Sequence, residues 1–137
     1  MHTYKCKIQR VVDGDTVDVD IDLGFNTWIL KERVRLDGID APESRTSDKV
    51  EKIFGIAAKT RLEELLPEGK IVTIITALSN EKFGRTLGKL YLDEISVNDL
   101  LVSEGHAVIY QGQSKDTIIE LHKTNRAKLI AEGKVVM

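Results

Sequence analysis

Residues 34–43 (Val-Arg-Leu-Asp-Gly-Ile-Asp-Ala-Pro-Glu) bring several groups capable of chemistry into a short stretch. Arg35 lies where apolar and polar residues alternate, which is the pattern of a half-buried β-strand. Pro42 ends that strand, because its ring fixes φ and pushes the preceding residue toward an extended conformation. Asp40 and Glu43 then follow the strand on a stiffened turn, where reacting groups can be held firmly.

The alternation raises a geometric problem for this stretch. If it continued unbroken, Arg35 and Asp40 would point to opposite faces of the strand. Gly38 is the natural place for a bulge or turn that shifts the parity and brings both side chains to one site. A polar turn after a strand would explain an isolated Asp-Ala-Pro-Glu equally well. Charged residues elsewhere in the chain must therefore distinguish a functional site from an ordinary polar turn.

Asp15 is the second unusual carboxylate. Residues 15–23 alternate cleanly, and Asp15 falls on the apolar face of that expected strand. An ionised carboxylate directed toward a core is costly unless a cation or hydrogen-bond donors meet it. The alternative is that Asp15 caps the preceding Asp-Gly turn at a frayed strand end.

These groups together predict metal-assisted phosphodiester hydrolysis. The carboxylates of Asp15 and Asp40, with backbone oxygens, suit a hard cation such as Ca²⁺ or Mg²⁺, and the lack of a His or Cys cluster disfavours zinc. Arg35 and Arg85 suit phosphate oxygens, because the planar guanidinium matches their geometry. A further carboxylate, Glu43, is available to activate water.

Composition limits how the chain could act on a polyanion. It has 137 residues, a net charge of −2 and a pI near 5.9, so a general basic field is excluded and attraction must be local. The length suits one domain over residues 1–137. No apolar run approaches a membrane span, and no leader is evident, so we expect a cytoplasmic monomer, or a secreted one if a leader has been removed. The single Cys6 is expected to be a buried, inert thiol.

The order of expected elements places the charged residues at strand ends and in loops. Strands are predicted at 4–12, 15–23, 27–37, 70–77, 86–92 and, briefly, 107–110; helices are predicted at 48–66, 96–105 and 116–131. Trp28 is expected to pack, and Asp48 to form a capping box with Glu51. Short strands without β-α-β alternation indicate an α+β domain on a small closed sheet.

Three motifs carry a resemblance to a known family: residues 13–17 (Asp-Gly-Asp-Thr-Val), 35–43, and 82–86 (Lys-Phe-Gly-Arg-Thr). In order and spacing the chain resembles the staphylococcal nuclease (thermonuclease) family over nearly its whole length. The resemblance implies a five-stranded OB-fold Greek-key β-barrel with three α-helices. It also implies a calcium-dependent endo/exonuclease, with Mg²⁺ or Mn²⁺ as alternative metals, that hydrolyses DNA and RNA and leaves 3′-phosphate ends.

The same resemblance implies roles for individual residues. Metal ligands are implied at Asp15, Asp40 and, through its backbone carbonyl, Ala41. Catalytic roles are implied for Arg35, Arg85 and, as general base, Glu43. Substrate contacts are implied at Lys82, Phe83, Tyr110 and Gln111.

Two departures from the family pattern concern the substrate contacts. Phe83 stands where the family often has Tyr, so a hydroxyl is missing, and Tyr110 lies one place away from the base-stacking Tyr, leaving Gln111 as the other candidate. His106 and His122 lie in apolar-patterned segments, which predicts structural roles. A non-catalytic OB-fold module that binds nucleic acid or mediates interactions is the alternative function, although aromatic residues make up only 5% of the chain.

Overall fold

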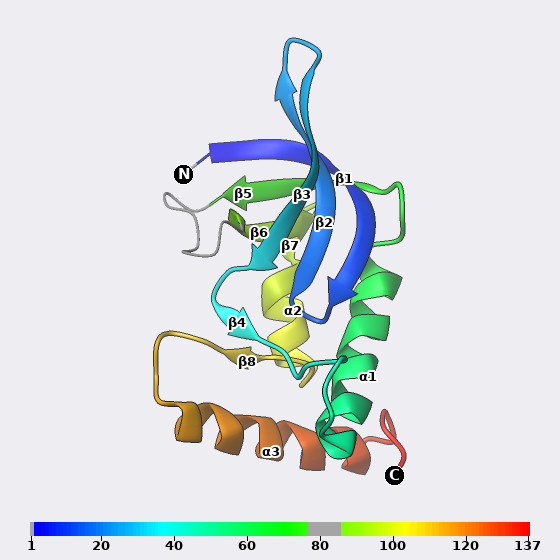
Figure 1. Ribbon diagram of the computed structural model, residues 1–137, viewed down its shortest axis with the longest axis vertical. Coiled ribbons are helices and arrows are strands. Elements are labelled where there is room, and N and C mark those ends of the chain that lie inside the picture. The colour runs from blue at the N-terminus through cyan, green and yellow to red at the C-terminus, as the bar shows by residue number, and fades with distance from the viewer. Residues whose placement is uncertain (1, 77–85) are drawn as a thin grey trace.

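The computed structural model describes residues 2–76 and 86–137, and its elements follow the predicted order (Figure 1). The helices are α1 (Lys49–Leu65), α2 (Val97–Ser103) and α3 (Lys115–Ala131). The longer strands are β1 (His2–Asp13), β2 (Thr16–Gly24), β3 (Thr27–Leu36), β5 (Ile71–Thr76) and β6 (Thr86–Leu92). The two-residue strands are β4 (Ile39–Asp40), β7 (Ile95–Ser96) and β8 (Val108–Ile109).

The five longer strands form a ring of pairings. The strand order is β3-β2-β1-β5-β6-β7, and β3 also pairs with β6. This last pairing is parallel and joins residues 34–36 to residues 86–88, whereas the other pairings in the sheet are antiparallel. The predicted α+β class with three helices is therefore confirmed, and the ring of five strands is the arrangement expected of an OB-fold.

The core lies inside this ring and under α1 and α2. Alternate residues of each strand point inward because successive side chains face opposite sides of a sheet. The fully buried residues include Ile8, Val17, Val19, Val34, Ile74 and Leu90 from the strands, and Ala58, Leu62 and Leu101 from the helices. Cys6 is also buried, and burial raises the pKa of its thiol to about 12, which fits the inert role predicted for it.

The β2–β3 hairpin extends away from this core (Figure 1). Trp28 is 42% exposed, so the prediction that it packs was wrong. Its neighbour across the hairpin, Asp22, is the last β2 residue that pairs with β1. Trp28 therefore lies at the end of the region where a third strand backs the hairpin.

The start of α1 is fixed by Asp48, whose carboxylate accepts hydrogen bonds from the backbone N–H groups of Val50 and Glu51. The predicted capping box was wrong in its second half. Instead of returning to Asp48, the Glu51 carboxylate accepts the backbone N–H of Glu43 at 3.0 Å. The first turn of α1 thus holds the loop that leads into it.

A very close approach also joins α1 to the loop before it. Gly55 faces the backbone at Glu43 and Ser44, and a Cβ at position 55 would lie 2.1 Å from the Glu43 carbonyl oxygen. Three residues later, Ala58 lies against Gly14, where an added Cβ would be 2.7 Å from the Ala58 Cβ. Positions three apart share a face of a helix, so α1 presents a stripe of small residues to these two backbone segments.

None of the helices in the described ranges has the length and apolar character needed to cross a bilayer.

We predict that Gly55→Ala lowers the free energy of unfolding by about 1–3 kcal/mol, because the new methyl group overlaps the loop backbone. Alanine is the better helix former by about 1 kcal/mol, so any loss must come from this overlap. Urea unfolding measures the effect, with Lys52→Ala on the exposed side of α1 as the control. A Gly55→Ala protein as stable as the wild type would show that the loop can move away at no cost.

Candidate active site

Three strand ends bring Asp15, Arg35 and Asp40 together. Asp15 directly precedes β2, and its carbonyl oxygen accepts the Leu36 N–H of β3 at 2.8 Å, which places it beside Arg35. Asp40 is the second residue of β4. Between β3 and β4 lies a turn at Gly38 with φ of +79°, a conformation that favours glycine. The predicted change of parity at Gly38 is thus confirmed.

A single guanidinium links the two carboxylates. Arg35 Nη1 lies 3.2 Å from Asp15 Oδ2, and Arg35 Nη2 lies 3.3 Å from Asp40 Oδ1. The Arg35 side chain is only 14% exposed, so these pairings are shielded from bulk water and strengthened by the surrounding protein. One positive charge thus faces two negative charges, and the group as a whole retains an attraction for cations.

Asp15 is buried, and hydrogen-bond donors meet its carboxylate. Its position on the apolar face of the strand is therefore not that of a frayed strand end. Its Oδ2 also accepts the backbone N–H of Ala41 at 3.0 Å, and its Oδ1 accepts the Thr16 hydroxyl at 3.0 Å. Burial raises the pKa of the Asp15 carboxyl, and the opposing effects of Arg35, the Ala41 N–H and the Thr16 hydroxyl do not cancel that rise. Ionised Asp15 is therefore held at a net cost in the absence of a further cation.

The loop that carries Glu43 is held from two sides. Asp13 Oδ1 accepts the backbone N–H groups of Gly14 and Ser44, each at 3.1 Å, and so ties the β1–β2 turn to the loop. Glu51 holds the Glu43 backbone, as described above. These bonds fix the main chain of Glu43 while its side chain remains exposed.

A pocket of about 290 Å³ lies beside Asp40 and Glu43. Asp40, Ala41 and Glu43 line one side of it, and His122 and other residues from the first turns of α3 line the other. The predicted metal ligand Asp40 and the predicted general base Glu43 therefore border the same space. Water or a substrate group in this pocket could meet both.

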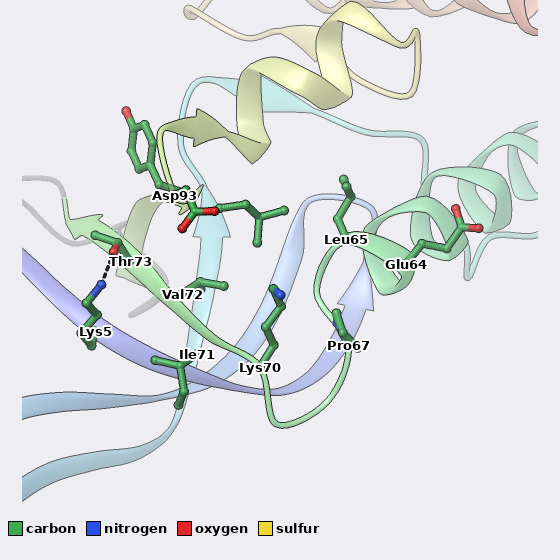
Figure 2. A pocket seen from close by; sticks show the side chains of 11 residues that line it. Lys5, Glu64, Leu65, Pro67, Lys70, Ile71, Val72, Thr73 and Asp93 are labelled. Carbon is green, nitrogen blue, oxygen red and sulfur yellow. Dashed lines mark hydrogen bonds between the residues drawn. The ribbon is translucent and has the colours of Figure 1, made fainter.

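A larger hollow of about 470 Å³ lies elsewhere, beside β5 and the end of α1 (Figure 2). Its charged lining includes Lys5, Lys70, Glu64 and Asp93, and Lys5 is already bonded to Thr73 at 3.0 Å. The two signs of charge balance there, and none of the predicted site residues lines it. We therefore place the candidate site at the smaller pocket.

The remaining predicted residues fall into two groups. Tyr110 and Gln111 follow β8, which pairs with β4, and Tyr110 donates its backbone N–H to the Gly38 carbonyl at 2.8 Å. Both side chains are exposed near the turn that precedes Asp40. Three further predicted residues, Arg85, Lys82 and Phe83, lie outside the described residues.

His122 is a site residue that the sequence did not reveal. Its Nε2 lies 2.8 Å from Asp40 Oδ2, although 82 positions separate the two residues. The apolar pattern around His122 indicated a structural role, and its type alone carried no signal of this contact. Only the docking of α3 beside β8 brings it to Asp40.

The donor atoms of the candidate site determine which cation it could hold. In the part of the chain that the structure describes, no three His, Cys, Asp or Glu side chains gather as a metal-binding group. Two carboxylates of the candidate site, Asp15 and Asp40, meet at one guanidinium. Ca²⁺ accepts carboxylate, backbone carbonyl and water oxygens together, so this all-oxygen set fits Ca²⁺ in its chemistry and requires backbone and water ligands to complete it.

Comparison with protein-family models gives a match over residues 33–131, to the family described as staphylococcal nuclease homologue. This range contains Arg35, Asp40 and Glu43. It covers more than two thirds of the chain, and it extends through all three helices.

Several curated proteins with related sequences are named as nucleases. A micrococcal nuclease of Shigella flexneri is 30% identical over 129 residues, covering 88% of this chain and 66% of the relative. A thermonuclease of Staphylococcus intermedius is 33% identical over 100 residues, covering 73% and 56%. Endonuclease YncB of Bacillus subtilis is 30% identical over 112 residues, covering 79% and 50%. The chain thus spans between half and two thirds of the length of these relatives.

We predict that Asp15→Asn raises the free energy of unfolding at pH 7 by on the order of 1 kcal/mol, because it removes a buried charge and keeps an acceptor for Ala41. A raised pKa in the folded state means that the native protein binds the proton more tightly than the unfolded chain. The gain should therefore shrink as the pH falls from 7 toward 4 and wild-type Asp15 becomes protonated. Urea unfolding across this range measures it.

Asp18 lies in β2, the strand that directly follows Asp15, and supplies a control for which the expected change in stability has the opposite sign. Hydrogen bonds from Arg33, and more weakly from Arg10, lower the pKa of Asp18. Asp18→Asn should therefore reduce stability at pH 7, by less than about 1 kcal/mol because both arginines are exposed, and the loss should fade in acid. If Asp15→Asn also reduced stability at pH 7, the pairing with Arg35 would outweigh the cost of burial.

Proposed function

The chain belongs to the staphylococcal nuclease family, and from this we propose that it is a calcium-dependent nuclease that hydrolyses phosphodiester bonds of DNA and RNA. The relatives named as nucleases support hydrolysis of nucleic acid at the level of the family. Attack by water at phosphorus with release of the 5′ oxygen would leave 3′-phosphate ends, which is the outcome that we propose for this chain.

The observation that carries this proposal is the meeting of Asp15, Arg35 and Asp40 beside the pocket that Glu43 lines. A carboxylate buried at a net cost next to an arginine is an arrangement typical of functional sites, because stability alone would not favour it. The chain brings these residues from separate strands and holds them with backbone hydrogen bonds, as preorganised catalysis requires.

Asp15, Asp40 and the Ala41 carbonyl are the residues that would hold Ca²⁺. When bound, the ion supplies positive charge that stabilises the negative charge developing on phosphate oxygens. Residual negative charge at the Asp15–Arg35–Asp40 group favours its binding. The cost of burying ionised Asp15 would be offset by the same ion, so the site is expected to be more stable with Ca²⁺ than without it.

Arg35 and Glu43 would act on the substrate itself. The Arg35 guanidinium would donate to phosphate oxygens, and its partial burial makes each donated hydrogen bond stronger than in water. The Glu43 carboxylate, exposed in the pocket, would accept a proton from the attacking water. From the family resemblance we propose that Arg85 donates to the same phosphate.

Four further residues are proposed to contact the substrate. Tyr110 and Gln111 are exposed beside the β4–β8 pair, and we propose that they contact a base or sugar. Lys82 and Phe83 are proposed as contacts from the family resemblance. With a net charge of −2, the chain has little general attraction for nucleic acid. Binding should therefore be weak and sensitive to salt.

We predict that the protein cleaves single-stranded DNA when Ca²⁺ is present and stops when the ion is chelated. Glu43→Gln should lower kcat by about 10²–10⁴-fold, because it removes the general base and keeps the shape of the side chain. Arg35→Lys should lower it by about a thousandfold, because the forked donor is lost. Gel assays of cleavage rate and analysis of the 3′ ends measure these effects.

Glu63→Gln is the matched control, because Glu63 is an exposed glutamate near the other end of α1. It should cleave at the wild-type rate. Unchanged cleavage by Glu43→Gln would remove Glu43 from the mechanism. No cleavage by the folded wild-type protein with Ca²⁺, Mg²⁺ or Mn²⁺, together with measurable binding of DNA, would favour the non-catalytic binding module.

A further inference from the structure

We propose that His122 is a positioning residue that fixes the orientation of the Asp40 carboxylate for cation binding. The inference rests on the proposed function, because it concerns the same metal site. It adds a residue from α3 to a proposed metal site whose ligands otherwise lie in strands and in the loops next to them.

The two oxygens of Asp40 have different partners. Oδ1 lies 3.3 Å from Arg35 Nη2, on the side that also holds Asp15. Oδ2 lies 2.8 Å from His122 Nε2, on the side of α3. An ionised carboxylate can only accept, so His122 must carry its proton on Nε2 and donate it to Oδ2. The plane of the carboxylate is therefore set by two donors from opposite directions.

His122 is itself held firmly enough to do this. Its side chain is 13% exposed, and it lies in the interior of α3, where neighbouring turns restrict its rotamers. Three residues along the same face, Asn125 Nδ2 donates to the Ala107 carbonyl at 3.1 Å. That bond ties α3 to the segment just before β8, and β8 pairs with the Asp40 backbone. The segment around β8 therefore holds the Asp40 backbone directly, and it also holds the helix whose His122 contacts the Asp40 side chain.

The Asp40 side chain has freedom that such a donor would remove. It is 31% exposed, so without His122 its Oδ2 would be hydrated and its carboxylate could rotate about the terminal bond. A cation ligand that rotates must be ordered when the ion binds, at a cost in affinity. Residues that orient metal ligands typically contribute 10–100-fold in metal affinity.

Three variants separate this role from the docking of α3. His122→Leu introduces a residue that favours an α-helix and removes the N–H group that donates to Asp40. His122→Gln keeps an N–H donor at a similar reach. Asn125→Ala is the matched control, because it removes a different polar contact of α3, the one with the Ala107 carbonyl, and does not touch Asp40. His122→Ala serves as a second deletion if the leucine variant does not fold.

The experiment is titration calorimetry with CaCl₂ at constant pH and without nucleic acid, after circular dichroism has shown each variant to be folded. We expect the Kd for Ca²⁺ to rise 10–100-fold in His122→Leu, to recover at least partly in His122→Gln, and to stay near the wild-type value in Asn125→Ala. Turnover of DNA at saturating Ca²⁺ should change less than turnover at limiting Ca²⁺, because the defect lies in binding the ion.

Some outcomes would overturn this inference and leave the proposed function standing. One is a wild-type Ca²⁺ affinity in His122→Leu, and another is an equal loss of affinity in Asn125→Ala, which would assign the effect to the docking of α3. A glutamine variant as weak as the leucine variant would also count against a hydrogen-bonding role. Failure of the wild-type protein to bind Ca²⁺ would instead overturn the proposed metal site, and this inference with it.

Discussion

Arg35 lies between two carboxylates that the fold brings close together, and this pairing constrains the positions of the strands that hold the three residues. Asp15 has little contact with solvent, so its charge would be prohibitive without the guanidinium and the Ala41 N–H. Arg35 contacts Asp40 as well as Asp15. The ends of β2, β3 and β4 must therefore lie close enough together for one arginine side chain to reach both carboxylates. The resulting group is well bonded yet still short of positive charge, which suits it to bind a cation.

The ring of strands supplies that convergence. The pairing of β3 with β2 places Arg35 beside Asp15. The pairing of β3 with β6 closes the sheet and so fixes the relative positions of these strands. Helix α1 then brings the loop containing Glu43 against the site. The absence of a side chain at Gly55 permits this close approach, and the Asp13 and Glu51 carboxylates hold the loop backbone by its N–H groups.

The far side of the site is closed by the last third of the chain. β4 and β8 contain two residues each, too few to be stable alone, so their pairing depends on the elements beside them. Helix α3 buries only Leu129 fully, and it meets the site region through the polar contacts of His122 and Asn125. Hydrogen bonds require particular distances and angles, so the orientation of the Asp40 side chain depends on how α3 docks.

The periodicity of the sequence determined the order of the main strands and helices, and its turn and charge pattern singled out Asp15, Arg35 and Asp40. These features are local, because side-chain alternation and the conformational limits of Gly38 act over a few residues. The sequence did not determine the exposure of Trp28, the β4–β8 pair, or the contact of His122 with Asp40. Those depend on where the sheet ends and how distant segments pack, and a pattern of period two or 3.6 carries no information about which segments meet. Only the tertiary structure, in which burial and pairing are satisfied together, decided them.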